Sequence, residues 1–330
     1  MNRLALLILL ALLAAAPPRL RAQDFFSQDE DIIPPDIGHM YVRGIQYLAE
    51  KQNPDGSWDA PFGNEPAVVG LCMLSMLAHG EDPNYGPYTD NVHRALDFVL
   101  KNQDPNTGYI GTSMYNHGFG TLALAEAYGY VHDDRVGPAL QKAVDLILNS
   151  QSRNASNAWR YSPDSPDADT TVSGAQMVAL FAARNAGIGV PEDAIRKALR
   201  FFADCQTADG GIGYTAPTAP DGARTAIGAL VFSLAKQQKS AAFRSAAQYL
   251  EANPSDEGGY HQYYLYYAAQ AYFRISPQVF DAWNAQNVKT LAADQLDDGS
   301  WSSPLGPTFS TAASLLSLAL NYRLLPIYER

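Results

Sequence analysis

Gln52-Asn53-Pro54-Asp55-Gly56-Ser57-Trp58 returns near the other end of the chain as Gln295-Leu296-Asp297-Asp298-Gly299-Ser300-Trp301. Each stretch follows a helix-like segment and ends in a glycine and an aromatic residue. The same pattern recurs between them in weaker form, with its first residue at Gln103, Gln151, Gln206 and Asn253. The six anchors lie about 50 residues apart, and self-similarity at such a period marks a repeat architecture.

Each repeat is predicted to contain two helices of different character. Before the anchor, apolar residues such as Val42, Ile45 and Leu48 recur at helical spacing opposite charged ones, which indicates a surface helix. After the anchor comes a segment that is apolar nearly all round, as in residues 172–183, and such helices are buried on most faces. The other segments of this second kind are residues 67–77, 118–127, 226–234 and 311–320.

Six outer and six inner helices that alternate along the chain predict an all-α fold, an α6/α6 toroid in which outer helices surround inner ones. An open solenoid is the alternative, but its end repeats need atypical polar faces. Here the two end repeats carry the strongest form of the motif, which favours closure of the first repeat onto the last. We expect one toroid domain over residues 38–330, preceded by an extended acidic arm over residues 23–37.

The first 22 residues have the features of a secretory signal peptide. A basic start, Met1-Asn2-Arg3, precedes an apolar run over residues 4–16, and Ala22 is a suitable last residue before cleavage. The run is shorter than the roughly 20 residues of a membrane-spanning helix, and no longer run follows it. The sequence therefore predicts a secreted or periplasmic protein without a membrane span in the mature chain; an uncleaved anchor is the alternative.

Charge and cysteine content exclude further classes. The net charge of −11 argues against nucleic acid as a partner, because phosphate backbones select basic surfaces. Cys72 and Cys205 are the only cysteines, too few for a disulfide framework, and their spacing does not decide whether they are bridged.

The repeated Gln-x-x-x-Gly-x-Trp/Tyr pattern resembles the repeat of the family that contains squalene–hopene cyclases and protein prenyltransferase β subunits. The resemblance extends over residues 38–330. It implies an α/α toroid with a central apolar cavity, in which the Gln and aromatic residues tie helices together and take no part in catalysis. In such a ring the N-termini of the inner helices open at one mouth, where their partial positive charge suits anionic groups.

The first family site falls at the mouth. Class II cyclases carry Asp-x-Asp-Asp-Thr before an inner helix, and the middle Asp protonates the substrate. This chain has Asp167-Ala168-Asp169-Thr170-Thr171, so the resemblance makes Asp169 and Asp167 catalytic candidates, with Thr170 in place of one Asp. The alternative is that Asp169 or Thr170 only caps the helix that follows.

The second family site is the zinc centre of prenyltransferases, which uses Asp-x-Cys and a later His. Asp221 and His261 match two of these ligands, but Ala223 replaces the Cys, and catalytic zinc needs three protein ligands. We therefore expect no metal and no cofactor. Asp221 is otherwise a helix cap near Arg224, and His261 a residue of the rim.

In the fifth repeat, an aromatic segment begins where the inner helix is expected to start, at the mouth of the ring. Tyr260, Tyr263, Tyr264 and Tyr267 share one face of a helix and are predicted to line the cavity wall. Such rings stabilise cations, stack on sugars or simply pack against the outer helices. His117 begins the second inner segment and is expected at the same mouth. The candidates for ligand binding are His117, Asp221, His261, Tyr263 and Tyr267.

Three functions remain open from the sequence. The first is a secreted toroid that binds a ligand or serves as a scaffold without the family's known chemistry. The second is a terpenoid-cyclase-like or prenyltransferase-like enzyme that uses Asp169. The third is a carbohydrate-active hydrolase or lyase with two carboxylates across the cavity, for which Asp169 and Asp221 are the candidate pair. Each has a small-molecule or polymer ligand in the central cavity as its partner.

Overall fold

Twelve α-helices account for most of the chain that the computed structural model describes, residues 33–80, 82–255 and 260–328. No β-strand occurs in these ranges. The predicted signal peptide over residues 1–22 lies outside the described residues, as does most of the predicted arm over residues 23–37. The end of that arm is corrected, because the first described helix begins at Pro35 and residues 35–37 are helical.

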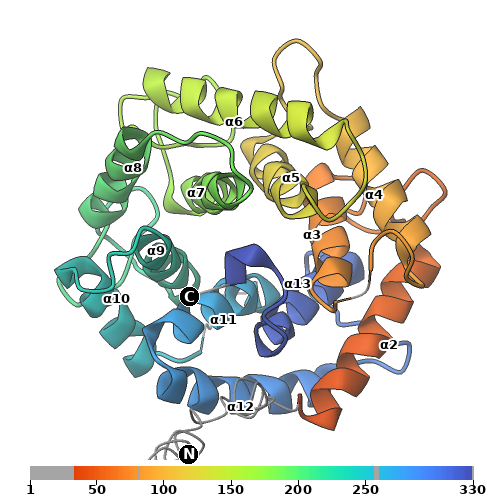
Figure 1. The fold of residues 1–330 in the computed structure, drawn as a ribbon. Coiled ribbons are helices and arrows are strands. Elements are labelled where there is room, and N and C mark those ends of the chain that lie inside the picture. Colours follow the sequence, from red (N-terminus) through yellow and green to blue (C-terminus); the bar gives the residue numbers. More distant parts are fainter. Residues whose placement is uncertain (1–32, 81, 256–259, 329–330) are drawn as a thin grey trace, which may run out of the picture. The chain divides into compact units, whose positions relative to one another are not determined.

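The helices form two concentric layers, as Figure 1 shows for the unit that begins at Pro35. The outer layer consists of α2 (Pro35–Lys51), α4 (Thr89–Lys101), α6 (Val136–Arg153), α8 (Glu192–Asp204), α10 (Ala241–Ala252) and α12 (Pro277–Asp294). The inner layer consists of α3 (Pro66–Leu77), α5 (Met114–Ala127), α7 (Thr170–Asn185), α9 (Gly222–Leu234), α11 (His261–Ile275) and α13 (Pro307–Leu318). The predicted all-α, α6/α6 toroid is confirmed.

Burial follows the pattern of apolar residues in the sequence. Every residue of α3 is buried, whereas α8 buries only one face, which includes Ile195, Leu199 and Phe202. A helix that is apolar on all sides must be covered on all sides, so it belongs to the inner layer. Within the described ranges, no helix is both long and apolar enough to cross a membrane.

The repeated Gln joins five of the outer helices to the next one. Gln52 Nε2 donates to Gly56 O in its own turn (3.2 Å) and to Asn91 O of α4 (3.1 Å). The last copy closes the ring: Gln295 Nε2 donates to Gly299 O and to Met40 O of α2, both at 2.9 Å. Gln103, Gln151 and Gln206 make the equivalent pairs of bonds.

The glycine of the motif is required by close approach. Gly299 has a φ of +89°, and a Cβ atom there would lie 2.4 Å from Arg43 O of α2. The turn therefore packs directly on the backbone of the neighbouring outer helix. The Trp301 indole then fills the space behind the turn and donates to Leu291 O (2.9 Å).

Short 3₁₀ segments follow the last inner helix, η2 (Ala319–Asn321) and η3 (Pro326–Tyr328). The η3 segment packs against α7, and the Arg274 guanidinium of α11 donates to Ile327 O. Both cysteines, Cys72 and Cys205, are buried and free, so the bridge that the sequence left open is absent.

Candidate functional site

Asp169 lies at the N-terminus of α7 and caps it. Its Oδ1 accepts hydrogen bonds from Thr171 N (2.9 Å), Thr171 Oγ1 (2.7 Å) and Val172 N (2.8 Å). These bonds satisfy amide groups that have no partner within a helix. The capping role that the sequence left open is therefore real for this oxygen.

The second oxygen of Asp169 is in a different situation. Oδ2 is buried and has no hydrogen-bond partner, and the whole residue is 0% exposed. Burial raises the pKa of this carboxyl, although the bonds to Oδ1 and the nearby Arg160 oppose the shift. Asp169 is thus an anchored carboxyl group with one oxygen held away from water.

Asp221 is a helix cap for comparison, because both of its side-chain oxygens have partners. It begins α9 and accepts from Arg224 N (2.7 Å), but its second oxygen forms an ion pair with the Arg224 guanidinium (2.6 Å). Its side chain is 37% exposed. The contrast indicates that capping alone does not account for the environment of Asp169.

Tyrosine hydroxyl groups surround the Asp169 cap. Tyr115 of α5 donates to Thr171 Oγ1 (2.6 Å), which in turn donates to Asp169 Oδ1. Tyr263 and Tyr267 of α11 meet edge to face, with ring centroids 5.1 Å apart, and both hydroxyls are buried without a hydrogen-bond partner. Burial raises the pKa of Tyr263, and the neighbouring Tyr115 and Tyr267 add to the shift. Three inner helices therefore supply polar groups to one place.

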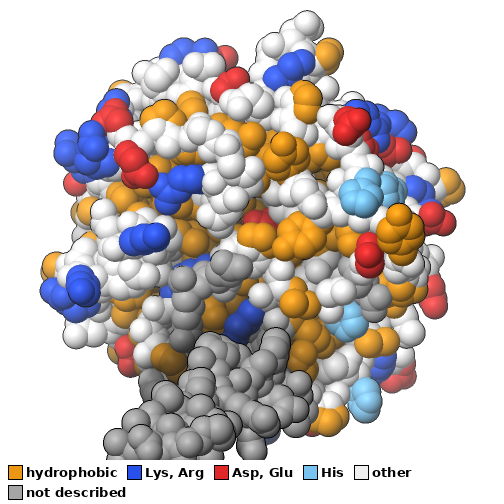
Figure 2. Space-filling view, viewed as in Figure 1, with side chains coloured by type: hydrophobic (Ala, Val, Ile, Leu, Met, Phe, Trp, Pro, Cys, Tyr) orange, Lys and Arg blue, Asp and Glu red, His pale blue; other side chains and the backbone are white. Residues whose placement is uncertain are grey.

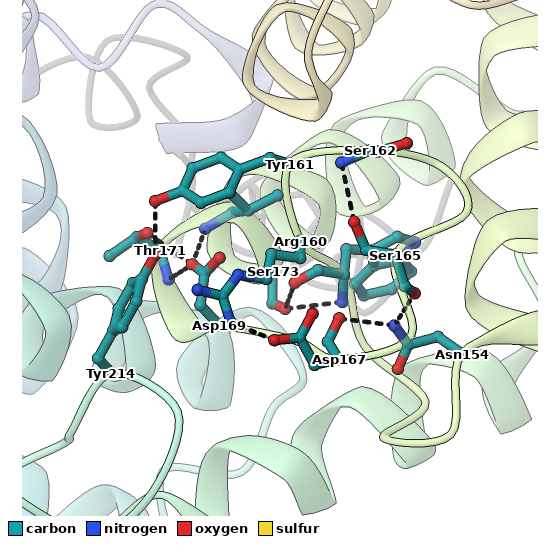
Figure 3. A network of polar contacts seen from close by, with 12 residues as sticks. Asn154, Arg160, Tyr161, Ser162, Ser165, Asp167, Asp169, Thr171, Ser173 and Tyr214 are labelled. Atoms are coloured by element: carbon teal, nitrogen blue, oxygen red, sulfur yellow. Dashed lines mark hydrogen bonds and ion pairs between the residues drawn. The ribbon is translucent and has the colours of Figure 1, made fainter.

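An aromatic and cationic rim covers this group from the loops (Figure 3). The hydroxyls of Tyr161 and Tyr214 lie 2.5 Å apart. The Arg160 guanidinium stands over both rings, 5.6 Å and 5.5 Å from their centroids, and it also pairs with Asp167. Since Tyr161 is 47% exposed, the rim faces solvent while Asp169 lies beneath it.

The candidates from the sequence are only partly brought together. Asp169, Tyr263 and Tyr267 share the group described above, through Tyr115. Asp167 is more than half exposed and bound to Arg160, and Asp221 is bound to Arg224. His261 is half-buried at the start of α11, where its ring lies 6.3 Å from that of Tyr264. No group of metal-ligating side chains occurs in the described part of the chain.

Three further positions differ from the arrangement expected from the sequence. Tyr264 does not share a wall with Tyr263, because its hydroxyl donates to Pro254 O near the outer layer (2.8 Å), and Tyr260 is 57% exposed. His117 is not at the mouth but fully buried. Its Nδ1 accepts from Ile110 N (3.1 Å) and its Nε2 bonds Ala143 O (3.0 Å). Both ring nitrogens are therefore used within the fold, and burial lowers the pKa of His117 to about 4.

The residue at the place of the family's additional Asp also has a structural role. Thr170 Oγ1 donates to Gly213 O (2.9 Å), and Thr170 N donates to Tyr214 O (2.9 Å). Thr170 thereby fastens the loop that carries Tyr214 to the start of α7. The residues that sequence reasoning missed, Arg160, Tyr161 and Tyr214, lie in loops; the signal that would have pointed to them is their position just after the turn motif.

Comparison with known proteins now identifies the family. A family described as a domain of unknown function, DUF6288, matches residues 40–271. The chain belongs to this family. No curated protein matches the chain.

Solved structures share the fold of the DUF6288 chain at low identity. The type II terpene cyclase MstE from Scytonema is 15% identical, with a TM-score of 0.62 over 88% of this chain and 99% of that one. The GH76A α-1,6-mannanase from Salegentibacter sp. HEL1_6 is 10% identical, with a TM-score of 0.64 over 86% and 98%. One MstE variant holds geranylgeranyl dihydroxybenzoate, and an inactive mannanase variant holds α-1,6-mannotriose. At these identities the likeness shows the α/α toroid and nothing finer.

Proposed function

We propose that this toroid binds a neutral ligand at the mouth of the ring and that Asp169 donates a proton to it. The observation that carries the proposal is the buried, unpartnered Oδ2 of a carboxyl group whose Oδ1 is fixed by three hydrogen bonds. Burial shifts this carboxyl toward its protonated form relative to a free Asp, and its fixed orientation directs the proton from Oδ2.

The surroundings suit a ligand without negative charge. The ligand approaches through the rim of Tyr161, Tyr214 and Arg160 and meets the hydroxyls of Tyr263 and Tyr267. Those hydroxyls and the carboxyl all have hydrogen-bonding capacity that the fold leaves unused. The aromatic faces stabilise positive charge that develops after protonation or stack on a sugar ring.

The known chemistry of the two toroid families is a weaker fit. Thr170 replaces one Asp of the cyclase motif and is bound to Gly213 O. Ala223 replaces the zinc-binding Cys, and Asp221 is bound to Arg224. The residues that this chain does have at the site suit proton donation by a single carboxyl group.

The test compares the wild-type protein with Asp169→Asn. Asparagine is a good helix cap and keeps the acceptor at Oδ1, so the variant retains the fold but loses the proton. Both proteins are incubated with geranylgeranyl dihydroxybenzoate, squalene and α-1,6-mannotriose, and products are followed by mass spectrometry. We expect turnover of one ligand class by the wild type and a loss of at least 100-fold in Asp169→Asn.

Asp298→Asn is the matched control, because Asp298 accepts from Ser300 N and Ser300 Oγ in an outer turn. Turnover that survives in Asp169→Asn, or that falls equally in the control, overturns the proposal. A titration of the Asp169 carboxyl by NMR adds a second readout, since a pKa at or below that of a free Asp removes its physical basis.

Ligand binding without catalysis is the second candidate, and the close packing of aromatic rings between α5 and α11 favours it. Phe119, Tyr266 and Tyr267 are buried, with ring centroids 5.9 Å apart for the first pair and 4.7 Å for the second. Binding of a ligand without products in the same incubations is the result expected for this candidate. Both candidate functions include export of the protein from the cell. The N-terminal sequence of the protein purified from its host tests whether the signal peptide is cleaved after Ala22.

A further inference from the structure

A cleft lies away from the mouth, where the carboxyl ends of α7 and α9 meet the start of α8. It has a volume of about 1180 Å³ and extends to Arg274 of α11 and to Ile327 of η3. The N-termini of α7 and α9, with Asp169 and Asp221, lie at the other ends of the same helices. The cleft is therefore separate from the proposed proton-donating site.

The charged side chains that line the cleft are mostly cationic. They are Arg184, Arg196, Lys236 and Arg274 against one carboxylate, Glu192. Figure 2 shows Lys and Arg side chains gathered over α8, α9 and α10 on this face. The whole chain has a net charge of −11, so this basic lining runs against the composition of the molecule.

Helix ends alone do not explain these cations. A C-terminal turn attracts a basic side chain, and Arg184 in the last turn of α7 fits that role. Arg196 does not, because it lies near the start of α8, where the helix dipole favours acidic residues. Arg184 and Arg196 each pair with an acidic side chain of α8, Glu192 and Asp193.

Lys236 is the most informative of the four. It follows α9 with a φ of +59°, a left-handed conformation that favours glycine. The positions that follow α3, α5 and α7 in the same way are glycines with φ near +90°: Gly80, Gly129 and Gly187. A lysine here costs stability that glycine avoids after α3, α5 and α7, and residues held in such strain often serve a function. Lys236 is exposed and forms no ion pair in the described structure.

We propose that this cleft binds a multivalent anion that carries carboxylate, sulfate or phosphate groups. Arg184 and Arg196 are each paired with a carboxylate, but a guanidinium group has five N–H donors and can bind an oxyanion as well. Lys236 adds a point charge. The buried Arg274 donates to Gln270 O and Ile327 O, so it contributes its positive charge to the cleft. The volume is that of a ligand site rather than a site for a single small ion.

The test is calorimetric titration of the full chain with citrate, sucrose octasulfate and inositol hexakisphosphate, which separate the three anion chemistries. We expect at least one to bind with a Kd below about 100 μM, and Lys236→Gln or Arg196→Gln to weaken it about tenfold. Lys289→Gln on α12 is the matched control, because Lys289 is exposed and lies outside the cleft. The control is expected to bind within twofold of the wild type.

Lys236→Gly separates binding from stability. Glycine relieves the left-handed strain, so we expect this variant to have a higher Tm and yet bind the anion about tenfold less tightly. No binding of any of the three anions below about 1 mM overturns the proposal, as does equal affinity of Lys236→Gln and Lys289→Gln. Asp169→Asn is expected to leave anion binding unchanged, so this proposal and the proton-donor proposal fail independently.

Discussion

The anchor residue at the end of α10 differs from the anchors that end the other five outer helices. In those five, the amide of a Gln joins its own turn to the next outer helix, and its bond to a carbonyl of that helix measures 2.8–3.1 Å. In the turn after α10 the anchor is Asn253, and its Nδ2 donates to Tyr249 O of its own helix (2.8 Å). Asn is one methylene shorter than Gln, so its amide bonds the helix that it ends.

A groove lies between α10 and α12, next to the helix that Asn253 ends. The groove has a volume of about 640 Å³ and is lined by residues such as Pro254, Tyr264 and Trp283. Beside it the inner helix α11 packs closely on the outer helix α12, as shown by the stacked rings of Tyr272 and Trp283, 5.0 Å apart. The comparison teaches that contacts between the inner and outer layers hold the ring where the described bond of the anchor stays within its own helix, while the Gln bridges fasten the outer layer.

Replacing the aromatic residue of the motif is expected to give the largest difference in the free energy of unfolding between the two kinds of turn. Trp301 is 0% exposed and its indole is bonded, so Trp301→Ala is expected to lower the free energy of unfolding by about 4 kcal/mol. Tyr260, in the turn after α10, is 57% exposed, and Tyr260→Ala should change it by less than about 0.5 kcal/mol. Urea denaturation measures both; equal losses would contradict the distinction.

Acid should weaken one bridged turn selectively. His117 Nδ1 accepts from Ile110 N at the end of the second turn, where Ser173, Thr225 and Thr311 supply hydroxyls in other repeats. Its folded pKa is about 4, below the ordinary 6.5, so between these values the unfolded chain binds the extra proton. The stability from His117 is present above pH 6.5 and falls by about 3 kcal/mol as pH drops to 4.

The measurement is the free energy of unfolding of the wild type and His117→Gln from pH 7 to pH 4. Glutamine does not titrate, so the free energy of unfolding of His117→Gln should lack the decrease between pH 6.5 and pH 4 that His117 causes. Parallel curves would show that His117 is protonated in the folded state or that the turn has opened.

Removal of the bridge itself should have the smallest effect. Gln295→Ala deletes three hydrogen bonds, two donated by Nε2 and one that Oε1 accepts from exposed Arg43, and leaves two carbonyl groups without that donor. The loss is expected to cost roughly 2 kcal/mol. Asn253→Ala removes one bond on an exposed surface and should cost less than about 0.5 kcal/mol. Denaturation midpoints compare the two variants. A larger loss of stability in Asn253→Ala than in Gln295→Ala would contradict the distinction between the two anchors.

The ring was predictable from the sequence because its rules are local. A Gln at a helix end, a Gly that tolerates positive φ and an aromatic residue two positions later occur within a few residues of each other, and each repeat presents them again. The cap at Asp169 was predictable for the same reason. Helix faces were predictable from the spacing of apolar residues, which is why α3 and α8 lie in the expected layers.

The composition of the site was less predictable, because its members come from segments that only the closed ring brings together. Tyr115, Tyr161 and Tyr214 belong to three repeats, and no local pattern relates them. His117 was expected at the mouth because it begins an inner segment, but the space beside Ile110 and Ala143 buries it. The position of a side chain on a helix does not show which neighbour will cover it.

The sequence by itself determined the number of repeats, the two helical layers and the caps at Asp169 and Asp221, since these depend on residue type and spacing. Only the tertiary structure decided that Asp169 Oδ2 is buried without a partner while the second oxygen of Asp221 meets Arg224. It also decided that Lys236 joins three arginines in one cleft. The physical reason is that desolvation and charge clustering belong to groups of neighbours, and those neighbours are distant in sequence until the ring closes.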